Sequence, residues 1–447
     1  MSGFNGTTTP APSCRLHRRH RLMESGCVLN TRCRGNGHRQ PHIGTTGRTS
    51  GAWWDLPVHV LHRFRHRTTG VWIATNPAWL PNDCRYSLAA RHHGEAHTSP
   101  MTRAPAGSQY QTRESFDPTA EVDLAETPST PETDMPLHPR IEQFLTWLRE
   151  QGTPPLHRVG VPTARDLMPG LRAAQGDPEP VAGVVDLLVR GPAGRLPVRI
   201  YQPGGGDGGR PLVVFFHGGG WSYGSLELVD RPLRRLANAT GAVIASVEYR
   251  LAPETCFPGP VEDAYAAVTA LAAQAGALSA DPHAVVVAGE SAGANLAAAV
   301  ALMARDRRGP RLHLQILMCP ILAPAKGSRF ASYHDYGQGY FITRDTLLTC
   351  WELYMSATEE SDHPYAAPLL APNLSKLPPA LILTAEFDPV RDEGEEYGNR
   401  LRTVGVEARV HRHEGMIHGF FLLSGIPEAV NPAIEEIGVE LRTRFPC

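Results

Sequence analysis

From residue 211 to the C-terminus, short unbroken apolar stretches alternate with longer segments in which apolar residues recur every three to four positions. The unbroken stretches are predicted to be strands, at 211–216, 242–247, 284–288, 312–318, 380–384 and 407–412. Amphipathic helices are predicted between and after them, at 228–238, 261–274, 292–305, 392–403 and 431–444. Strands without polar alternation are buried on both faces, so helices must cover both. The pattern predicts an α/β fold with a mostly parallel central sheet flanked by helices.

Upstream of this alternation the pattern is less regular. Helices are predicted near 141–148 and 163–172, and two short strands at 184–189 and 196–201, joined at Gly191–Gly194. Residues 323–376 interrupt the alternation with aromatic, loop-rich sequence, which we interpret as part of a lid.

The first 134 residues differ from the rest of the chain. Residues 1–100 hold thirteen arginines and ten of the twenty histidines against four acidic residues, and 101–134 are acidic and rich in Pro, Thr and Ser. Neither part shows a useful apolar period, so 1–134 is predicted to be disordered. Alternatively, it is upstream sequence read from a start codon placed too early, since Met101 and Met135 lie downstream. A basic arm that binds anions or nucleic acid and a His/Cys metal site stay open as alternatives, although no ligand spacing or aromatic interleaving supports them.

Composition limits the remaining classes of partner. The net charge is −2 and the pI about 6.9, so bulk charge indicates neither a nucleic-acid partner nor a membrane partner. No apolar run reaches the roughly 20 residues of a membrane span, and no secretory h-region is found at the start. The eight cysteines are irregularly spaced, which is typical of free thiols in a reducing compartment. We therefore expect a cytoplasmic protein without stable membrane insertion.

Two stretches match the Gly-x-Ser-x-Gly pattern of a nucleophilic serine, one centred on Ser222 and one on Ser291. Such a serine needs a strand ending directly before it and a helix beginning directly after it, because the sharp turn between them lifts Oγ out of the sheet. The strand at 284–288 and the helix at 292–305 give Ser291 this context. Ser222 lies six residues past its strand, in a glycine-rich loop. We predict that Ser291 is the nucleophile and Ser222 an ordinary loop serine.

A glycine run follows the strand at 211–216, in the sequence His217-Gly-Gly-Gly-Trp221. Glycines allow several backbone N–H groups to point at one spot, which the oxyanion of acyl transfer requires. A flexible turn explains an isolated glycine run equally well. Here the run follows a strand and precedes a serine elbow, which favours the catalytic interpretation.

An elbow serine also needs a carboxylate that orients the base, placed between the serine and the histidine along the chain. Asp388 follows the strand at 380–384 and precedes a proline, which holds it in an extended or turn conformation. We predict that Asp388 is this acid. Its rivals are Glu386, Asp392 and Glu393, of which the last two are expected to begin the next helix.

Three histidines follow the acid. His411 and His413 alternate at the end of the strand at 407–412 and are predicted to be half-exposed strand residues. His418 is bracketed by glycines in a predicted loop before the last helix. Because loops at the carboxyl ends of strands carry the sites of such sheets, His418 is predicted to be the base.

These residues resemble the hormone-sensitive-lipase-like family of bacterial esterases, over residues 135–447. The matching stretches are Met135-Pro-Leu-His-Pro-Arg-Ile-Glu-Gln-Phe144, His217-Gly-Gly-Gly-Trp221, Tyr249-Arg-Leu-Ala-Pro-Glu254, Gly289-Glu-Ser-Ala-Gly-Ala-Asn-Leu296, Leu377-Pro-Pro-Ala380, Asp388-Pro-Val-Arg-Asp-Glu-Gly394 and His418-Gly-Phe420. Nothing in 1–134 resembles the family.

The resemblance implies an α/β-hydrolase fold in which about 135–180 and 323–376 form a helical cap. It implies that Gly219, Gly220 and Ala292 donate backbone N–H groups to the oxyanion hole and that Gly218 supports the loop. Family members often dimerise, so a homodimer is possible. Two departures from the family pattern, Glu290 where Asp is commonest and Ala294 where Gly is commonest, remove no catalytic group; we expect them to tune packing or the pH optimum.

The expected activity is hydrolysis of short-to-medium acyl esters through Ser291, Asp388 and His418 and an acyl-enzyme intermediate, with no cofactor or metal. Deacetylation or acyl transfer on a specific metabolite would use the same site. A non-catalytic ligand receptor on this fold is a further alternative, but such receptors lose the histidine that is present here. A peptidase would share the catalytic residues, although the glycine-rich loop favours esters.

Overall fold

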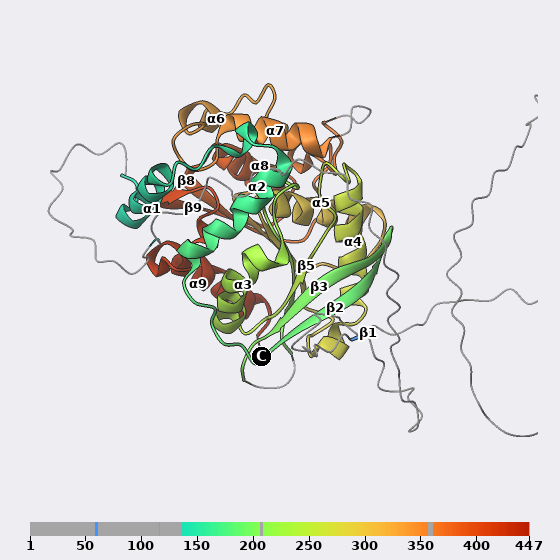
Figure 1. The fold of residues 1–447 in the computed structure, drawn as a ribbon. Coiled ribbons are helices and arrows are strands. Elements are labelled where there is room, and N and C mark those ends of the chain that lie inside the picture. The colour runs from blue at the N-terminus through green and yellow to red at the C-terminus, as the bar shows by residue number, and fades with distance from the viewer. Residues whose placement is uncertain (1–58, 61–115, 117–135, 206–208, 356–360, 447) are drawn as a thin grey trace, which may run out of the picture. The chain divides into compact units, whose positions relative to one another are not determined.

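A sheet of nine strands forms the centre of the protein, in the order β1-β2-β3-β5-β4-β6-β7-β8-β9 (Figure 1). The computed structural model describes residues 59–60, 116, 136–205, 209–355 and 361–446. The strands are β1 (His59–Val60), β2 (Gly183–Gly191), β3 (Gly194–Gln202), β4 (Leu212–Phe216), β5 (Val243–Val247), β6 (Val285–Glu290), β7 (Leu314–Met318), β8 (Ala380–Phe387) and β9 (Ala408–Ile417).

The strands from β4 onward pair in parallel with one another, as the unbroken apolar stretches predicted. β5, β4, β6, β7, β8 and β9 pair in parallel, whereas β1, β2 and β3 add an antiparallel edge. Every residue of β4, β5, β6 and β7 is buried. Parallel strands place their carboxyl ends at the same edge of a sheet, so the segments that follow β4, β6 and β8 are brought together.

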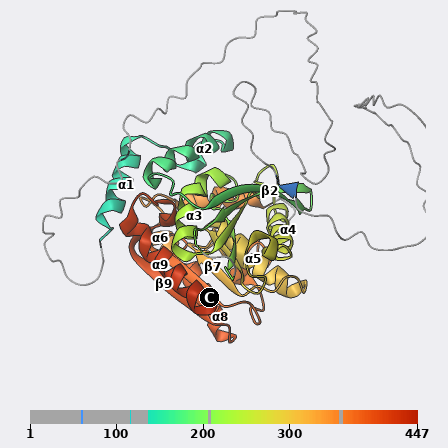
Figure 2. The ribbon, with the colours of Figure 1, turned by 90° about the horizontal axis from the view of Figure 1, so that it is seen from below.

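Helices cover both faces of the sheet (Figure 2). α3 (Leu226–Thr240) and α9 (Pro427–Arg444) pack on one face, and α4 (Gly259–Ala272), α5 (Ala292–Asp306) and α8 (Arg391–Thr403) on the other. Alternate residues of β4 enter the two cores, with Val213 and Phe215 facing α3 and α9. The predicted strands and helices of residues 211–447 are therefore confirmed with small shifts at their ends, except that the last strand runs five residues past its predicted end.

Most of the shorter helical segments lie before β2 and between β7 and β8, whereas η4 precedes β6 and η6 follows β9. They are α1 (Pro139–Glu150), η2 (Leu156–Arg158), α2 (Val161–Leu167), η3 (Met168–Gln175), η4 (Ala275–Leu278), α6 (Ser332–Asp335), α7 (Arg344–Tyr354), η5 (Pro368–Leu370) and η6 (Phe420–Leu422). The expected single helix at 163–172 is wrong. The chain instead begins α2 at Val161 and continues as the 3₁₀ helix η3 from Met168, because Pro169 has no N–H for the α-helical ladder.

The two predicted cap segments meet each other in space. The His157 ring of η2 lies 3.1 Å from the Thr346 hydroxyl of α7 and 3.4 Å from the Thr343 hydroxyl. Phe144 of α1 contacts Phe341 just before α7, with ring centroids 5.9 Å apart.

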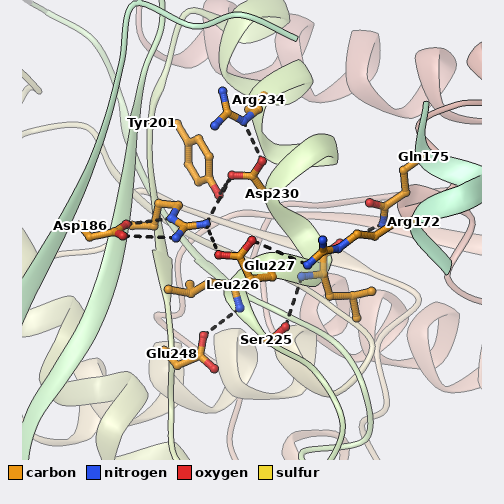
Figure 3. Close-up of polar contacts among 12 residues, drawn as sticks. Arg172, Gln175, Asp186, Tyr201, Ser225, Leu226, Glu227, Asp230, Arg234 and Glu248 are labelled. Carbon is orange, nitrogen blue, oxygen red and sulfur yellow. Dashed lines mark hydrogen bonds and ion pairs between the residues drawn. The ribbon is translucent and has the colours of Figure 1, made fainter. Parts of the chain in front are cut away.

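Charged side chains join this cap to the body of the protein (Figure 3). Arg172 of η3 lies 3.8 Å from Glu227 of α3, and Arg199 of β3 lies 2.9 Å from the same carboxylate. Arg199 also pairs with Asp186 at 2.8 Å and with Asp230 at 3.5 Å. Because Arg199 has several acceptors at once, the network holds η3, β2, β3 and α3 in one arrangement.

Two described contacts come from residues before 135. β1 pairs antiparallel with β2, and Phe116 is buried against Phe144 and Trp147 of α1, at centroid distances of 5.9 and 5.4 Å. The prediction that 1–134 is disordered otherwise lies outside the described residues.

Candidate active site

Ser291 stands at the turn between β6 and α5. Its φ is 58° and its ψ −118°, a conformation that is strained for a residue with a side chain. A Cβ on Gly289 would collide with the carbonyl of Gly293, and a Cβ on Gly293 would collide with the carbonyl of Phe216. The glycines on both sides of the serine are therefore required by close backbone packing, and the result is the sharp elbow that a nucleophilic serine needs.

Three buried side chains from three different segments meet at this elbow. The Nε2 atom of His418 lies 2.8 Å from the Oγ atom of Ser291, and its Nδ1 atom lies 2.9 Å from the Oδ2 atom of Asp388. The other carboxylate oxygen of Asp388 accepts a hydrogen bond of 2.9 Å from the Val390 N–H. The structure thus brings together the three residues that the sequence singled out as nucleophile, acid and base.

The protonation of His418 is controlled by its surroundings. Burial alone would lower the pKa of the His418 imidazole, but the charge of Asp388 and its hydrogen bond outweigh burial and raise that pKa above its ordinary value. A raised pKa makes His418 a stronger base toward the Ser291 hydroxyl.

Glu290 is a second buried carboxylate beside His418. Its Oε1 atom lies 3.9 Å from the Nε2 atom of His418. Burial raises the pKa of Glu290 to about 7, although the charge of His418 acts in the opposite direction. In the sequence, Glu290 stands out only as a departure from the family pattern. Its proximity to Nε2 means that its charge acts directly on the candidate base.

The rival acids have other partners. Glu386 accepts a hydrogen bond of 2.7 Å from the Gly415 N–H, and Asp392 and Glu393 lie in the first turn of α8, as expected. Glu393 is buried and accepts hydrogen bonds from the Leu322 N–H, the Ala323 N–H and the Tyr333 hydroxyl, at 2.6, 2.9 and 2.6 Å. These carboxylates hold neighbouring loops and do not bond to His418.

The structure corrects two expectations about the histidines, because β9 ends later than predicted and His413, predicted to be a half-exposed strand residue, is buried. β9 continues to Ile417, so the predicted end of the strand at 412 is wrong. His418 is therefore the first residue after the strand, where a longer loop was predicted to precede it. The strand continues because a bulge between Ala385 and Phe387 lets Ile417 pair with Phe387. His411 is exposed but His413 is buried, and burial lowers the pKa of His413 to about 4.

The glycine run after β4 packs directly against the serine elbow. Gly219 and Gly220 have φ values of 102° and 55°, which favour glycine, and the Gly219 carbonyl accepts hydrogen bonds from the N–H groups of Ser222 and Tyr223 at 3.0 and 2.8 Å. A Cβ on Gly218 would collide with the Glu290 carboxylate. Gly218, Gly219 and Gly220 are therefore a tight turn lying beside the elbow that begins α5 at Ala292.

Ser222 does not stand at such an elbow. It lies within the same turn as the glycines, its side chain is buried, and its Oγ atom has no hydrogen-bond partner among the residues that the structure describes. No histidine bonds to it, as the sequence predicted for a loop serine.

Two residues outside the predicted site hold this glycine turn. The Tyr249 hydroxyl donates a hydrogen bond of 2.8 Å to the His217 carbonyl, and the two rings stack 4.3 Å apart. Arg165 of α2 donates to the Ser222 carbonyl at 2.8 Å and to the Ala252 carbonyl at 2.9 Å, and forms two bonds of 2.8 Å to Glu254. The sequence drew attention to Tyr249 and Glu254 only as part of a motif and to Arg165 not at all, because its partners lie 57 to 89 residues away.

Aromatic side chains of the second predicted cap segment lie near the glycine turn and the residue after His418. Phe341 would contact a Cβ built on Gly419, the residue after His418. Trp221 stacks on Tyr354 of α7 at 4.2 Å and contacts Trp351 at 5.0 Å.

None of the described helices combines the length and the apolar character that a membrane span requires.

Comparison with known proteins agrees with this geometry. A family model described as the α/β-hydrolase fold matches residues 213–422. The carboxylic ester hydrolase LipN of Mycobacterium tuberculosis is 39% identical over 266 residues, which are 58% of this chain and 70% of LipN. An arylesterase of Saccharolobus solfataricus is 34% identical over 313 residues, 70% of this chain and all of the arylesterase.

Solved structures extend the similarity to the fold. The hyperthermophilic esterase of the archaeon Pyrobaculum calidifontis superposes with a TM-score of 0.65 at 39% identity, over 69% of this chain and 99% of that esterase. The sheet, the elbow and the relatives together show that the chain belongs to the hormone-sensitive-lipase-like family of α/β-hydrolases and is a carboxylic-ester hydrolase.

Proposed function

We propose that the protein hydrolyses carboxylic esters with short to medium acyl chains through a Ser291–His418–Asp388 triad. The observation that carries this proposal is the unbroken chain of hydrogen bonds from the Ser291 Oγ atom through both nitrogens of His418 to Asp388. All three side chains are buried, so the bonds are shielded from water.

The reaction follows from these contacts. As the Ser291 Oγ atom forms a bond to the ester carbonyl carbon, the Nε2 atom of His418 takes its proton. The carbonyl then re-forms, the alcohol leaves with the proton held by His418, and an acyl-enzyme ester on Ser291 remains. A water molecule, deprotonated by the same nitrogen, attacks that ester and releases the carboxylic acid. Asp388 stabilises the imidazolium that forms in each half of the reaction and keeps the imidazole in the required tautomer.

We assign the oxyanion hole to the backbone N–H groups of Gly219, Gly220 and Ala292, with Gly218 supporting the turn. Gly219 and Gly220 adopt positive φ values, and Gly218 packs on the residue that precedes Ser291. Ala292 begins α5, where backbone N–H groups have no partner within the helix and favour negative charge. Donors fixed in advance stabilise the negative charge of the tetrahedral intermediate without reorganising.

The cap supports a preference for short to medium acyl chains, about two to eight carbons. Phe341 stands over the residue after His418, and Trp351 and Tyr354 pack against Trp221, which follows the glycine turn. Bulky rings at these positions favour a closed pocket over an open lipid groove.

Hydrolysis of p-nitrophenyl esters of increasing acyl length tests the preference. We expect kcat/KM to be highest between two and eight carbons and to fall for longer chains. Fastest turnover on emulsified long-chain triglycerides, with activation at the interface, would contradict it. Analysis of the products in the presence of competing alcohols separates hydrolysis from acyl transfer.

Labelling with an organophosphonate tests the nucleophile. Ser291→Ala should abolish covalent labelling and lower kcat by several orders of magnitude. Ser222→Ala is the matched control, since it changes the serine of the other Gly-x-Ser-x-Gly match, and it should keep the label. Loss of the label in the Ser222 variant, together with its retention in the Ser291 variant, would reverse the assignment.

A further inference from the structure

A second group of histidine and carboxylate side chains lies at the far edge of the sheet. β9 is the last strand of the sheet order, and α9 lies beside it (Figure 2). Side chains two positions apart point to the same face of a strand, so Arg409, His411 and His413 share one face of β9. Their contacts show that this face is turned toward Glu436 of α9. None of these side chains takes part in the proposed reaction.

The geometry of this group is compact. The Nδ1 atom of His411 lies 2.5 Å from the Oε2 atom of Glu436, and the Nε2 atom of His413 lies 3.8 Å from the same oxygen. One ligand atom from each of the three residues lies within 4.8 Å of the other two. The two imidazole rings are 4.5 Å apart.

Two buried polar atoms of the group have no hydrogen-bond partner in the described part of the chain. His413 is 6% exposed and packs against Phe420, yet its Nε2 atom is unbonded; the same is true of the Oε1 atom of Glu436. Buried polar groups without partners are costly and rare in folded proteins. The ion pair between His411 and Glu436 accounts for one nitrogen and one oxygen of the group, and Arg409 lies 3.4 Å from the other Glu436 oxygen. Within the described residues, neither contact accounts for the Nε2 atom of His413.

A divalent transition-metal ion accounts for the orphaned nitrogen. Two imidazole nitrogens and a carboxylate oxygen form a ligand set that Zn²⁺ prefers, with bonds of about 2.0–2.2 Å, which places ligands roughly 3.3 Å apart. The observed separations of 2.5 and 3.8 Å lie on either side of that value, so small side-chain rotations suffice. The His411 side chain is 52% exposed, which leaves a fourth position open to water.

The guanidinium group of Arg409, which lies beside Glu436, does not prevent a metal ion from binding. The Nε atom of Arg409 lies 3.4 Å from the Oε1 atom of Glu436, and its Nη1 atom lies 3.9 Å from Glu440. The Arg409 side chain is 58% exposed, so it can turn toward solvent and keep Glu440 as its partner while the metal ion takes its place beside Glu436.

We propose that His411, His413 and Glu436 form a binding site for a Zn²⁺-type divalent metal ion, separate from the catalytic triad. Such an ion would join the edge strand to the last helix. His413 packs on Phe420, which follows His418 by two residues, so the site would stabilise the segment that carries the candidate base. The proposal does not depend on the proposed function, and it revises the expectation that the protein holds no metal.

Zinc binding to the full chain tests the proposal by difference. Residues 1–100 contain ten further histidines, and histidine is a common zinc ligand, so the variants are compared with the parent protein and not with an absolute zinc capacity. Isothermal titration with zinc chloride and elemental analysis after dialysis should find one fewer bound ion per chain in His411→Ala and in Glu436→Gln. Far-UV circular dichroism and ester hydrolysis without added zinc establish that each variant is folded.

His334→Ala is the matched control. His334 is also an exposed histidine beside a carboxylate, 3.0 Å from Asp335, but it has no second histidine, and its variant should bind as much zinc as the parent. Zinc should raise the Tm of the parent and of this control more than that of His411→Ala. Equal stoichiometry and equal Tm shifts in the parent and the His411 variant would overturn the proposal. Anomalous diffraction from a zinc-loaded crystal should place the ion between the three side chains.

Discussion

Asp388 and Glu386 both follow the apolar part of β8, yet they bond to different partners. Asp388 bonds to His418, whereas Glu386 bonds to the Gly415 N–H. Asp388→Asn should therefore lower kcat by roughly 10³–10⁴ with the fold intact, because an amide favours the wrong imidazole tautomer. Glu386→Gln should cost about tenfold or less, since an amide oxygen still accepts from Gly415. Steady-state kinetics on a short ester checks both, and equal losses would mean that the acid is misassigned.

Glu290 offers a second prediction for a single residue. Its carboxylate lies 3.9 Å from the Nε2 atom of His418, and a negative charge there helps to raise the pKa of His418. Hydrolysis needs neutral His418, so activity is lost as the pH falls through that pKa. Glu290→Gln removes the charge and so lowers the pKa of His418, which should move the acidic limb of the kcat/KM profile to lower pH.

The control for this shift is Glu386→Gln, which removes a carboxylate that does not bond to His418. Its acidic limb should coincide with that of the parent protein. A Glu290 variant whose limb stays in place, or moves to higher pH, would show that Glu290 does not act on His418 through its charge.

At the scale of elements, Arg165 of α2 donates a hydrogen bond to the glycine turn, at the Ser222 carbonyl. Arg165→Met removes bonds to two carbonyls and to Glu254, so the turn that presents the proposed oxyanion donors loses its support from the cap. We expect kcat to fall about tenfold with a smaller change in KM, because misplaced donors weaken the transition state more than substrate binding.

Arg307→Met is the matched control for Arg165→Met. Arg307 forms the same two-bond pair with a carboxylate, that of Glu262, at 2.8 and 2.6 Å, but on α4 and α5 away from the turn. Its variant should keep kcat within about twofold, since surface ion pairs contribute little. Similar losses of kcat in both variants would show a general effect on stability and not support of the turn.

At the scale of the whole molecule, the question is how much residues 1–134 contribute to the esterase. The hydrophobic cores are built almost entirely from residues after 135, with Phe116 as the described exception. A chain that begins at Met135 should therefore fold and keep essentially full activity on small esters. It loses the packing of Phe116 on α1, which is worth about 2 kcal/mol, so its Tm should be a few degrees lower.

A chain that begins at Met101 separates the contribution of Phe116 from that of β1, because it keeps Phe116 and loses β1. Its Tm should match that of the full chain if Phe116 is the contact that matters. Aggregation of the Met135 chain, or loss of most of its activity while it stays folded, would show that residues 1–134 are part of the enzyme. Thermal unfolding and hydrolysis of a short ester provide both readouts.

Much of this protein follows from local sequence patterns. The unbroken apolar stretches predict the parallel sheet because burial on both faces leaves no place for polar residues. The glycines beside Ser291 predict the elbow because no Cβ fits there. Asp388 and His418 follow strands β8 and β9 directly, and parallel strands bring such positions to one edge, so the sequence order sufficed to select them.

Only the tertiary structure decided what depends on partners far apart in the chain. Arg165 bonds to residues 57 to 89 positions away, and Glu290 acts on a histidine of a different strand, so no local pattern marks either. β9 continues past residue 412 because a bulge re-pairs it with β8, and His413 is buried because α9 and Phe420 lie against it. The apolar period and backbone sterics depend on neighbours in the chain, so the sequence by itself determined the sheet, the elbow and the order of the site residues. Hydrogen bonds and charge interactions depend on distance in space, so only the tertiary structure decided the partners of Arg165, Glu290 and His413.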